Sequence, residues 1–421
     1  MINISKETNH YLILLLAFFV PTSLFFTKLI MVLIIALWLF SGSLKTKLKK
    51  ISKNQIALAS ILFFASHILG LLWTSNLDYG LKMISKMIEF LVFLPILLTT
   101  LDQEKKSSYI TSFLAAIFIT ICIVNLSFFG FDQLNELIRS FFSERFDGRT
   151  PFNSTITQGL TFSLSLYLTI ERFLKIIGKE KNIQNNLKIV FLAFFILSLI
   201  VAVFNSTSRI GYILVALVII FQLLQFLRTK HAILSILVSF LLIFYFFYSD
   251  SSHFKERVNN AATEMIEYIQ SGIYKNTSIG SRLYWAKNSL ELIKENFFLG
   301  VGTGDFKDEH EKVHMNNHEN SMSSHNNPHN MYLLVFANFG IVGLLIFLNI
   351  FKQMLQLAKK EKNRKYKRMG YFFILLYFVA MFNDSYLLGH YTQSLFFLFV
   401  SIIFSNNKNS TNECIDNYPK I

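Results

Sequence analysis

Three polar signatures interrupt the apolar sequence between residues 205 and 343, and their residue types suit phosphate-linked substrates. Ser206-Thr207-Ser208-Arg209 opens an apolar run, and Ser281-Arg282-Leu-Tyr-Trp285 lies inside a long hydrophilic segment. His329-Asn330 closes that segment. Arginine offers phosphate oxygens a charged fork, and histidine accepts a proton near neutral pH. We therefore predict a site for a phosphate-linked substrate at a membrane face, in which Arg209, Arg282 and His329 converge outside the cytosol.

Each of these residues also has a purely structural explanation, and on position alone both interpretations stay open. Arg209 at a span end could extend toward lipid headgroups, and Arg282 could stack on Trp285 at the surface. His329 could be an interfacial histidine held by hydrogen bonds. Four further residues are candidates for substrate binding: Arg145, Arg149, Trp285 and Asn330. The first two could equally be solvated.

Two other patterns invite a ligand interpretation and are less favoured. His310, His314 and His318 recur every four residues, with His325 and His329 beyond, as a metal-binding helix face would. Their neighbours give no apolar pattern to hold a rigid site, so no metal is expected. Residues 300–304 (Gly-Val-Gly-Thr-Gly) lack the Lys-Ser/Thr of a phosphate loop and follow a predicted helix, which favours a turn.

The composition indicates a multi-pass, all-α membrane protein. The chain has 421 residues, of which 53% are hydrophobic, 16% are charged and 46 are phenylalanine. Apolar runs near the ~20 residues that a helix needs to cross a bilayer recur from end to end. Twelve spans are expected, at about 11–26, 28–41, 55–72, 80–98, 109–129, 153–172, 188–204, 209–227, 231–248, 330–351, 370–386 and 389–404. The fourth carries Lys82, Lys86 and Glu89 at helical spacing, so it should face the bundle interior or an interface.

Lysine-rich short loops predict the orientation, because such loops stay in the cytoplasm. Residues 45–53 hold five lysines and no acid, and residues 352–368 hold eight basic residues against Glu361 alone. Both termini are therefore expected in the cytoplasm, and the N-terminal apolar run is expected to stay uncleaved. The net charge of +14 reflects these loops and does not indicate nucleic-acid binding. Cys122 and Cys414 cannot form a disulfide framework.

The spans divide the chain into four parts. Residues 1–248 are expected to hold nine transmembrane helices, residues 249–329 a periplasmic loop, residues 330–404 three more helices, and residues 405–421 a cytoplasmic tail. Within the loop, the apolar periodicity predicts helices over 256–270 and over 281–296, the second capped by Ser281. The Gly340-x-x-Gly343 pattern predicts close approach between membrane helices.

Taken together, residues 205–345 resemble the O-antigen ligase and O-antigen polymerase superfamily of bacterial inner-membrane glycosyltransferases. The resemblance lies in the order of Ser-Arg at a helix start, Ser-Arg-x-x-x-Trp, Leu-Gly-Val-Gly-Thr-Gly-Asp-Phe, and His-Asn followed by Gly-x-x-Gly. Residues 72–76 (Leu-Trp-Thr-Ser-Asn) also have the look of the family, whereas Leu344 departs from it mildly.

The resemblance implies a role for each residue. Arg209 and Arg282 would engage the pyrophosphate of an undecaprenyl-linked glycan, and His329 would be the base that activates the acceptor hydroxyl. The enzyme would need neither ATP nor metal nor another cofactor, and it would invert the anomeric centre. Its partners would be the lipid-linked glycan, a lipid A–core acceptor in lipopolysaccharide biosynthesis, and membrane lipids.

Other functions stay possible at this point. The favoured function is an O-antigen ligase. An O-antigen polymerase and a protein O-oligosaccharyltransferase are the alternatives within the superfamily. A transporter is less favoured, because most spans carry no charge near the middle of the bilayer.

Overall fold

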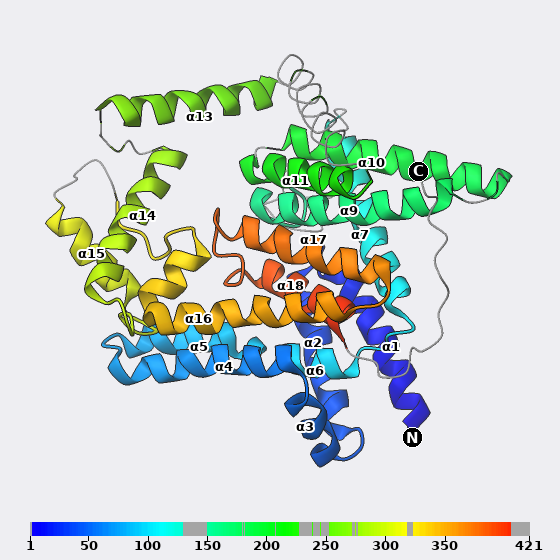
Figure 1. The fold of residues 1–421 in the computed structure, drawn as a ribbon, viewed down its shortest axis with the longest axis horizontal. Coiled ribbons are helices and arrows are strands. Elements are labelled where there is room, and N and C mark those ends of the chain that lie inside the picture. Colours follow the sequence, from blue (N-terminus) through cyan, green and yellow to red (C-terminus); the bar gives the residue numbers. More distant parts are fainter. Residues whose placement is uncertain are drawn as a thin grey trace. The chain divides into compact units, whose positions relative to one another are not determined.

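The computed structural model describes residues 2–128, 150–178, 180, 182–206, 208–226, 238, 245, 252–271, 274, 277–317 and 323–405. Several predictions fall outside these residues: nearly all of the span at 231–248, the tail beyond 405, Arg145, Arg149 and His318. The regular elements within the described ranges are all helices, as the composition predicts (Figure 1). The chain divides into two compact units.

The first unit comprises residues Met1–Leu16, Leu24–Tyr109 and Asn260–Asn406. It contains most of α1 (Ile2–Phe19) and of α13 (Ser252–Ser271). Its other helices are α2 (Leu24–Phe40), α3 (Leu44–Ser52), α4 (Gln55–Gly70), η1 (Leu71–Trp73), α5 (Leu77–Leu91), α6 (Phe93–Thr100), α14 (Ser278–Glu295), α15 (Phe306–Asn316), α16 (Met331–Lys360), α17 (Arg364–Ala380) and α18 (His390–Phe404). Phenylalanine rings fill its core, among them Phe63, Phe90, Phe347 and Phe396, in mostly edge-on or tilted contacts.

The second unit comprises residues Ala17–Ser23, Ile110–Asn259 and Asn407–Ile421. Its helices are α9 (Thr155–Ile177), α10 (Ile183–Asn205), α11 (Arg209–Phe226) and most of α7 (Lys106–Phe128). Hydroxyl groups on α9 donate to carbonyls one turn back, as Ser163 does to Gly159 at 2.8 Å and Ser165 to Thr161 at 2.8 Å. Buried polar side chains are thereby satisfied without water, which an apolar environment requires.

The membrane character is confirmed, whereas the count of twelve spans stays a prediction. Four described helices are long and apolar enough to cross a membrane, over Gln55–Trp73, Lys106–Leu126, Ile183–Asn205 and Met331–Lys360. A fifth results if α2 and α3, bent by 117°, count as one span. The expected span at 80–98 is two helices that break at Val92. Pro95 lies in the first turn of α6, where its missing N–H costs no helical bond.

Both predicted helices of the hydrophilic segment are present. The prediction over 256–270 corresponds to α13, and the prediction over 281–296 corresponds to α14. The prediction that Ser281 caps α14 is wrong. Thr277 is the N-cap residue, because its hydroxyl accepts the N–H of Gly280 at 3.1 Å, and Ser281 is buried one turn later.

The Gly340-x-x-Gly343 pattern has a different role from the predicted helix packing, because Gly340 breaks α16. Its backbone has φ +61° and ψ −164°, a conformation that glycine alone adopts readily. The segment after α14 replaces the lost helical bonds: Val301 N–H donates to Ala337 O at 2.9 Å, and Gly302 N–H donates to Asn338 O at 2.8 Å. A Cβ on Gly343 would lie 2.0 Å from the Cβ of Phe339, so the second glycine also serves the break.

The glycine-rich segment 300–304 is a structural joint, in agreement with the predicted turn. Thr303 donates its hydroxyl to His67 O at 2.6 Å, which ties the segment to α4. Asp305 accepts the N–H groups of Ser75 and Asn76 at 2.7 and 2.8 Å. The stretches 72–76 and 300–305 therefore form one contact, which fixes α14 and α15 against the end of α4 and the break in α16.

Candidate functional site

His329 lies in a strained loop immediately before α16. Its φ of +51° falls in the left-handed region, which is uncommon for residues other than glycine. The side-chain oxygen of Asn327 accepts the His329 N–H at 2.9 Å and closes a tight turn that holds this conformation. Strained backbone of this kind costs about 1–3 kcal/mol and is found preferentially at functional sites.

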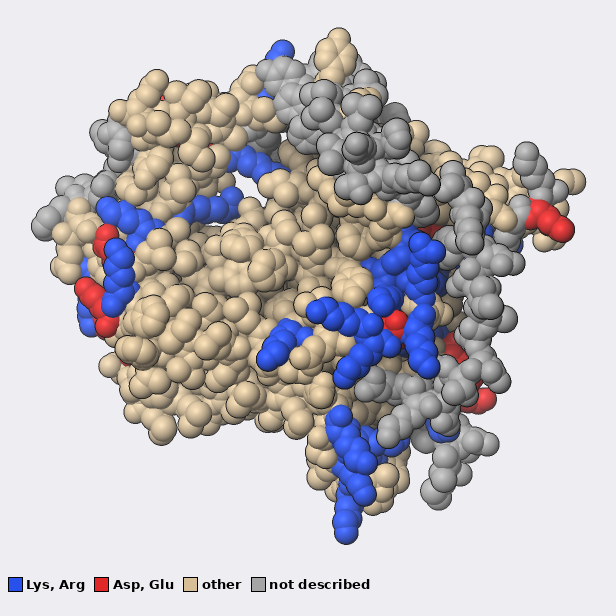
Figure 2. All heavy atoms as spheres, viewed as in Figure 1, with Lys and Arg blue, Asp and Glu red and all other residues tan. Residues whose placement is uncertain are grey.

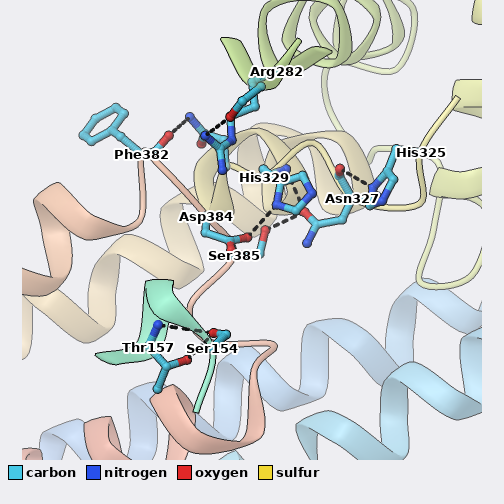
Figure 3. Close-up of polar contacts among 11 residues, drawn as sticks. Ser154, Thr157, Arg282, His325, Asn327, His329, Phe382, Asp384 and Ser385 are labelled. Atoms are coloured by element: carbon cyan, nitrogen blue, oxygen red, sulfur yellow. Dashed lines mark hydrogen bonds and ion pairs between the residues drawn. The ribbon is translucent and has the colours of Figure 1, made fainter. Parts of the chain in front are cut away.

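Asp384 orients the His329 ring (Figure 3). The distance from His329 Nδ1 to Asp384 Oδ1 is 3.0 Å, and the side chains are 24% and 22% exposed, so a substrate can reach the pair. The N–H of Ser385 donates to the same carboxylate oxygen at 2.7 Å, and the Ser385 hydroxyl donates to Asn327 Oδ1 at 2.8 Å. When Nδ1 donates to the carboxylate, Nε2 keeps its lone pair and is available as a base.

Asn330, predicted to bind substrate, has its polar atoms engaged within the protein. Its side-chain oxygen accepts the N–H groups of Tyr332 and Leu333 at 3.0 and 3.1 Å, which caps α16. Its side-chain nitrogen donates to Phe382 O at 3.2 Å, and Met331 N–H donates to Met381 O at 2.9 Å. These bonds favour a positioning role, since they join the start of α16 to the loop that carries Asp384.

Trp285 forms a platform of rings with two histidines. Its indole stacks on His325 with 4.7 Å between ring centroids, and it lies 5.3 Å from the ring of His329. The two histidine rings are themselves 5.0 Å apart. The Trp285 Nε1–H donates to Ser323 O at 2.9 Å, which fixes the indole. Flat aromatic surfaces of this kind suit the apolar face of a sugar ring.

Arg282 lies on α14, one turn before Trp285, on the same side of the site as His329 and Asp384 (Figure 3). Its Nη1 donates to the Ser278 hydroxyl at 3.4 Å. Burial and the Asp384 carboxylate raise the pKa of Tyr386, and the nearby Arg282 guanidinium opposes that rise. The positive charge of Arg282 therefore acts on the loop between α17 and α18 that holds the catalytic candidates.

Arg209 is the first residue of α11 in the second unit, at a helix start as predicted. The Ser208 hydroxyl accepts the N–H of Gly211 at 3.3 Å, so serine caps this helix. Gly211 packs against Gly159 of α9, which brings the two helices close together. The expected convergence of Arg209 with Arg282 and His329 stays a prediction.

The histidines of α15 have separate partners. The Nδ1 of His310 shares a hydrogen bond with the Ser324 hydroxyl at 3.3 Å, whereas the Nδ1 of His314 shares one with the Tyr284 hydroxyl at 2.7 Å. Burial lowers the pKa of His310 to about 4, so that side chain is neutral at physiological pH. Within the described ranges, no three His, Cys, Asp or Glu side chains are placed to hold a metal ion.

Sequence reasoning missed Asp384, Asn327 and Ser385. Asp384 is the acidic residue of a short loop between two apolar helices, and an acid in that place is itself a signal of function. A phosphate site is indicated by cationic side chains, whereas the ring of a histidine base is oriented by an anionic partner, here Asp384.

Comparison with known proteins gives one family. Residues 193–348 match the family model described as O-antigen ligase, and no curated protein matches the chain. The matched segment contains Arg209, Arg282, Trp285 and His329, whereas Asp384 lies beyond it. The match confirms the resemblance seen in the sequence: residues 193–348, somewhat over a third of the chain, are similar to the O-antigen ligase and polymerase superfamily of glycosyltransferase-like membrane proteins.

Proposed function

We propose that the protein is an O-antigen ligase, which transfers a glycan from undecaprenyl pyrophosphate to lipid A–core oligosaccharide. The observation that carries this proposal is the His329–Asp384 pair, which lies in reach of substrate beside Trp285 and Arg282. A histidine with one nitrogen fixed by a carboxylate is suited to take a proton from a hydroxyl group. The family match supports the same chemistry.

The proposed reaction is one displacement. The acceptor hydroxyl oxygen attacks the anomeric carbon as its proton passes to His329 Nε2, and the bond from that carbon to the pyrophosphate oxygen breaks. Attack from the face opposite the leaving group inverts the anomeric configuration. Asp384 stays ionised and stabilises the imidazolium, which afterwards releases the proton to water. Undecaprenyl pyrophosphate leaves with the electron pair of the broken bond.

Arg282 and Arg209 are proposed to bind the donor pyrophosphate. Negative charge grows on that group as the glycosidic bond breaks, and fixed guanidinium groups stabilise charge where it develops. The pyrophosphate is already an activated leaving group, so the reaction as proposed draws on neither ATP nor a metal ion. Trp285 would support the sugar ring beside the base.

The reaction is proposed to take place at the periplasmic face of the inner membrane, in a chain with twelve spans and cytoplasmic termini. Lysine and arginine side chains gather over α3 (Figure 2), and lysines at 45, 47, 49, 50 and 53 lie on or next to that helix. Such clusters stay on the cytoplasmic side. The segment with α14 and α15 would then lie outside.

The experiment that tests the function compares two substitutions in a strain that depends on this protein. His329→Ala should abolish attachment of glycan to lipid A–core, since a general base contributes about 10²–10⁴ in rate. Asp384→Asn should reduce attachment about a hundredfold, because an amide can hold the ring in the wrong tautomer. Asp78→Asn, an exposed acid in the first turn of α5, is the matched control.

The readout is a lipopolysaccharide gel with lipid-linked glycan measured alongside. Loss of the ladder with accumulation of long glycan on the carrier lipid supports a ligase. Loss of long chains with single repeats still attached to core would instead identify a polymerase, which the family also includes. A full ladder in the His329→Ala strain would end the base assignment.

A further inference from the structure

Helix α5 carries a stripe of charge opposite its buried face. Gly80, Met83, Met87 and Phe90 are buried, whereas Lys82, Lys86 and Glu89 recur at helical spacing on the other side. Lys82 and Lys86 are exposed, so of the two expected settings, the bundle interior or an interface, the interior is wrong for these two lysines. Only Glu89 is partly covered, and it forms an ion pair with Lys28 of α2.

The charged stripe meets the beginnings of α2 and α18. Leu24 N–H, at the start of α2, donates to the Tyr391 hydroxyl at 3.2 Å, so these two helix ends lie together. Gln393 Nε2 donates to Lys86 O at 3.2 Å, which joins α18 to α5 at the same level. The charges of Lys28, Lys86 and Glu89 all act on His390, the first residue of α18.

The loop between α17 and α18, which carries Asp384, lies at this same end of the first unit. Asp384 and His390 belong to the connection between α17 and the start of α18, six residues apart. Helix α5 continues past the ends of α2 and α18, since Leu77 precedes Lys86 by nine residues, or about 13 Å of helix. Lys82 precedes Lys86 by one turn and therefore lies about level with the first residues of α18, where lipid headgroups would be found.

The balance of charge at this place favours an anionic ligand. Three lysines, Lys28, Lys82 and Lys86, lie along this stripe with two carboxylates, that of Glu89 and that of Asp78, which precedes Lys82 by four residues. Among the described residues, neither Lys82 nor Lys86 has an acidic side chain within ion-pair distance. Exposed ammonium groups beside apolar helices are costly unless an anion meets them, and phosphate at a membrane surface is such an anion.

We propose that Lys82 and Lys86, with Lys28 and His390, bind a phosphate group on the headgroup of the lipid acceptor. The identification of the lipid as the acceptor rests on the proposed function. In the proposed reaction the donor pyrophosphate is assigned to Arg209 and Arg282, so the phosphate bound by the α5 lysines is assigned to the other substrate, the lipid A of the acceptor. The site would anchor the acceptor beside the loop that carries Asp384.

The test uses the purified full-length protein in lipid nanodiscs with lipid A–core as acceptor. The double variant Lys82→Gln/Lys86→Gln should raise the acceptor KM about tenfold or more, with kcat and the donor KM within about twofold of wild type. Lys49→Gln/Lys50→Gln removes the same charge from exposed positions on α3 and is the matched control. Lys82→Arg/Lys86→Arg keeps the charge and should restore the acceptor KM.

Acceptor chemistry separates the sources of phosphate. With dephosphorylated acceptor, the acceptor KM of the wild type should rise by a similar factor. The acceptor KM of the Gln variant should not rise further. A rise in the donor KM instead, or equal use of both acceptors by the wild type, would overturn the proposal. So would displacement of lipid A by phosphatidylglycerol at equal concentration, since the site would then be a general one for anionic lipid.

Direct binding of lipid A to the nanodisc-embedded protein keeps this proposal separate from the proposed function. The wild type should bind lipid A at least tenfold more tightly than the Gln variant does. A wild type without transferase activity would contradict the function, and equal binding by the two proteins would contradict the phosphate site.

Discussion

At the scale of single residues, the site depends on how the backbone presents His329. With its backbone at a φ of +51°, His329 presents its imidazole to Asp384. The Asn327 side chain stabilises that backbone conformation by accepting the His329 N–H. The residue type was predictable from the sequence, because a histidine at a membrane entry stands out among apolar neighbours. Its partner was not, since Asp384 is 55 positions away and only the fold brings it within 3.0 Å.

Arg282→Lys should reduce transfer about tenfold to a hundredfold, although the positive charge is kept. A guanidinium binds two phosphate oxygens at once, whereas an ammonium acts as a single point charge. The measurement is transfer in nanodiscs as a function of donor concentration, with Arg282→Gln for comparison and Lys294→Gln on the same helix as control. Equal rates for wild type and Arg282→Lys would show that Arg282 contributes charge alone.

At the scale of elements, the sequence predicted helices well where periodicity is strong and missed the places where a helix is interrupted. Helices α13 and α14 follow from their apolar faces, and the membrane helices follow from long apolar runs. The breaks at Val92 and Gly340 could not be predicted, because hydrophobicity continues across both. At Gly340 the decisive partner is the backbone of 297–302, a contact that no local pattern of residues reveals.

Gly340→Ala should destabilise the protein far more than Gly42→Ala. Both glycines have φ +61°, so alanine at either position incurs backbone strain of about 1–3 kcal/mol. A Cβ at Gly340 would also lie 2.2 Å from the backbone of Phe298, whereas nothing lies within 4 Å at Gly42. The difference between the two variants therefore isolates the clash.

Thermal unfolding in detergent, followed by size-exclusion chromatography with fluorescence detection, measures this difference. We expect Gly42→Ala to unfold a few degrees below wild type and Gly340→Ala to give little folded protein. Similar unfolding temperatures for the two variants would mean that the segment after α14 can shift to admit the alanine side chain. That segment would then not be what stabilises the break in α16.

At the scale of the whole molecule, the family segment extends across both compact units. Residues 193–259 of the match belong to the second unit, and residues 260–348 belong to the first. Arg209 and His329 therefore lie within one family match, although they belong to different compact units. Orientation in the membrane can be tested on the first unit alone, because that unit holds both the lysine-rich helix α3 and His329.

Single cysteines on the first unit should report opposite sides of the membrane. In a background with Cys122→Ser and Cys414→Ser, Lys294→Cys on α14 should react with a membrane-impermeant maleimide in intact spheroplasts. Lys49→Cys on α3 should react only after the membrane is permeabilised. Both positions are exposed, so accessibility depends on the side of the membrane and not on burial.

The physical reason for this expectation is that lysine-rich short segments resist translocation. Labelling of Lys49→Cys in intact cells, with Lys294→Cys protected, would reverse the orientation and place His329 in the cytoplasm, where an acceptor exposed in the periplasm could not reach it.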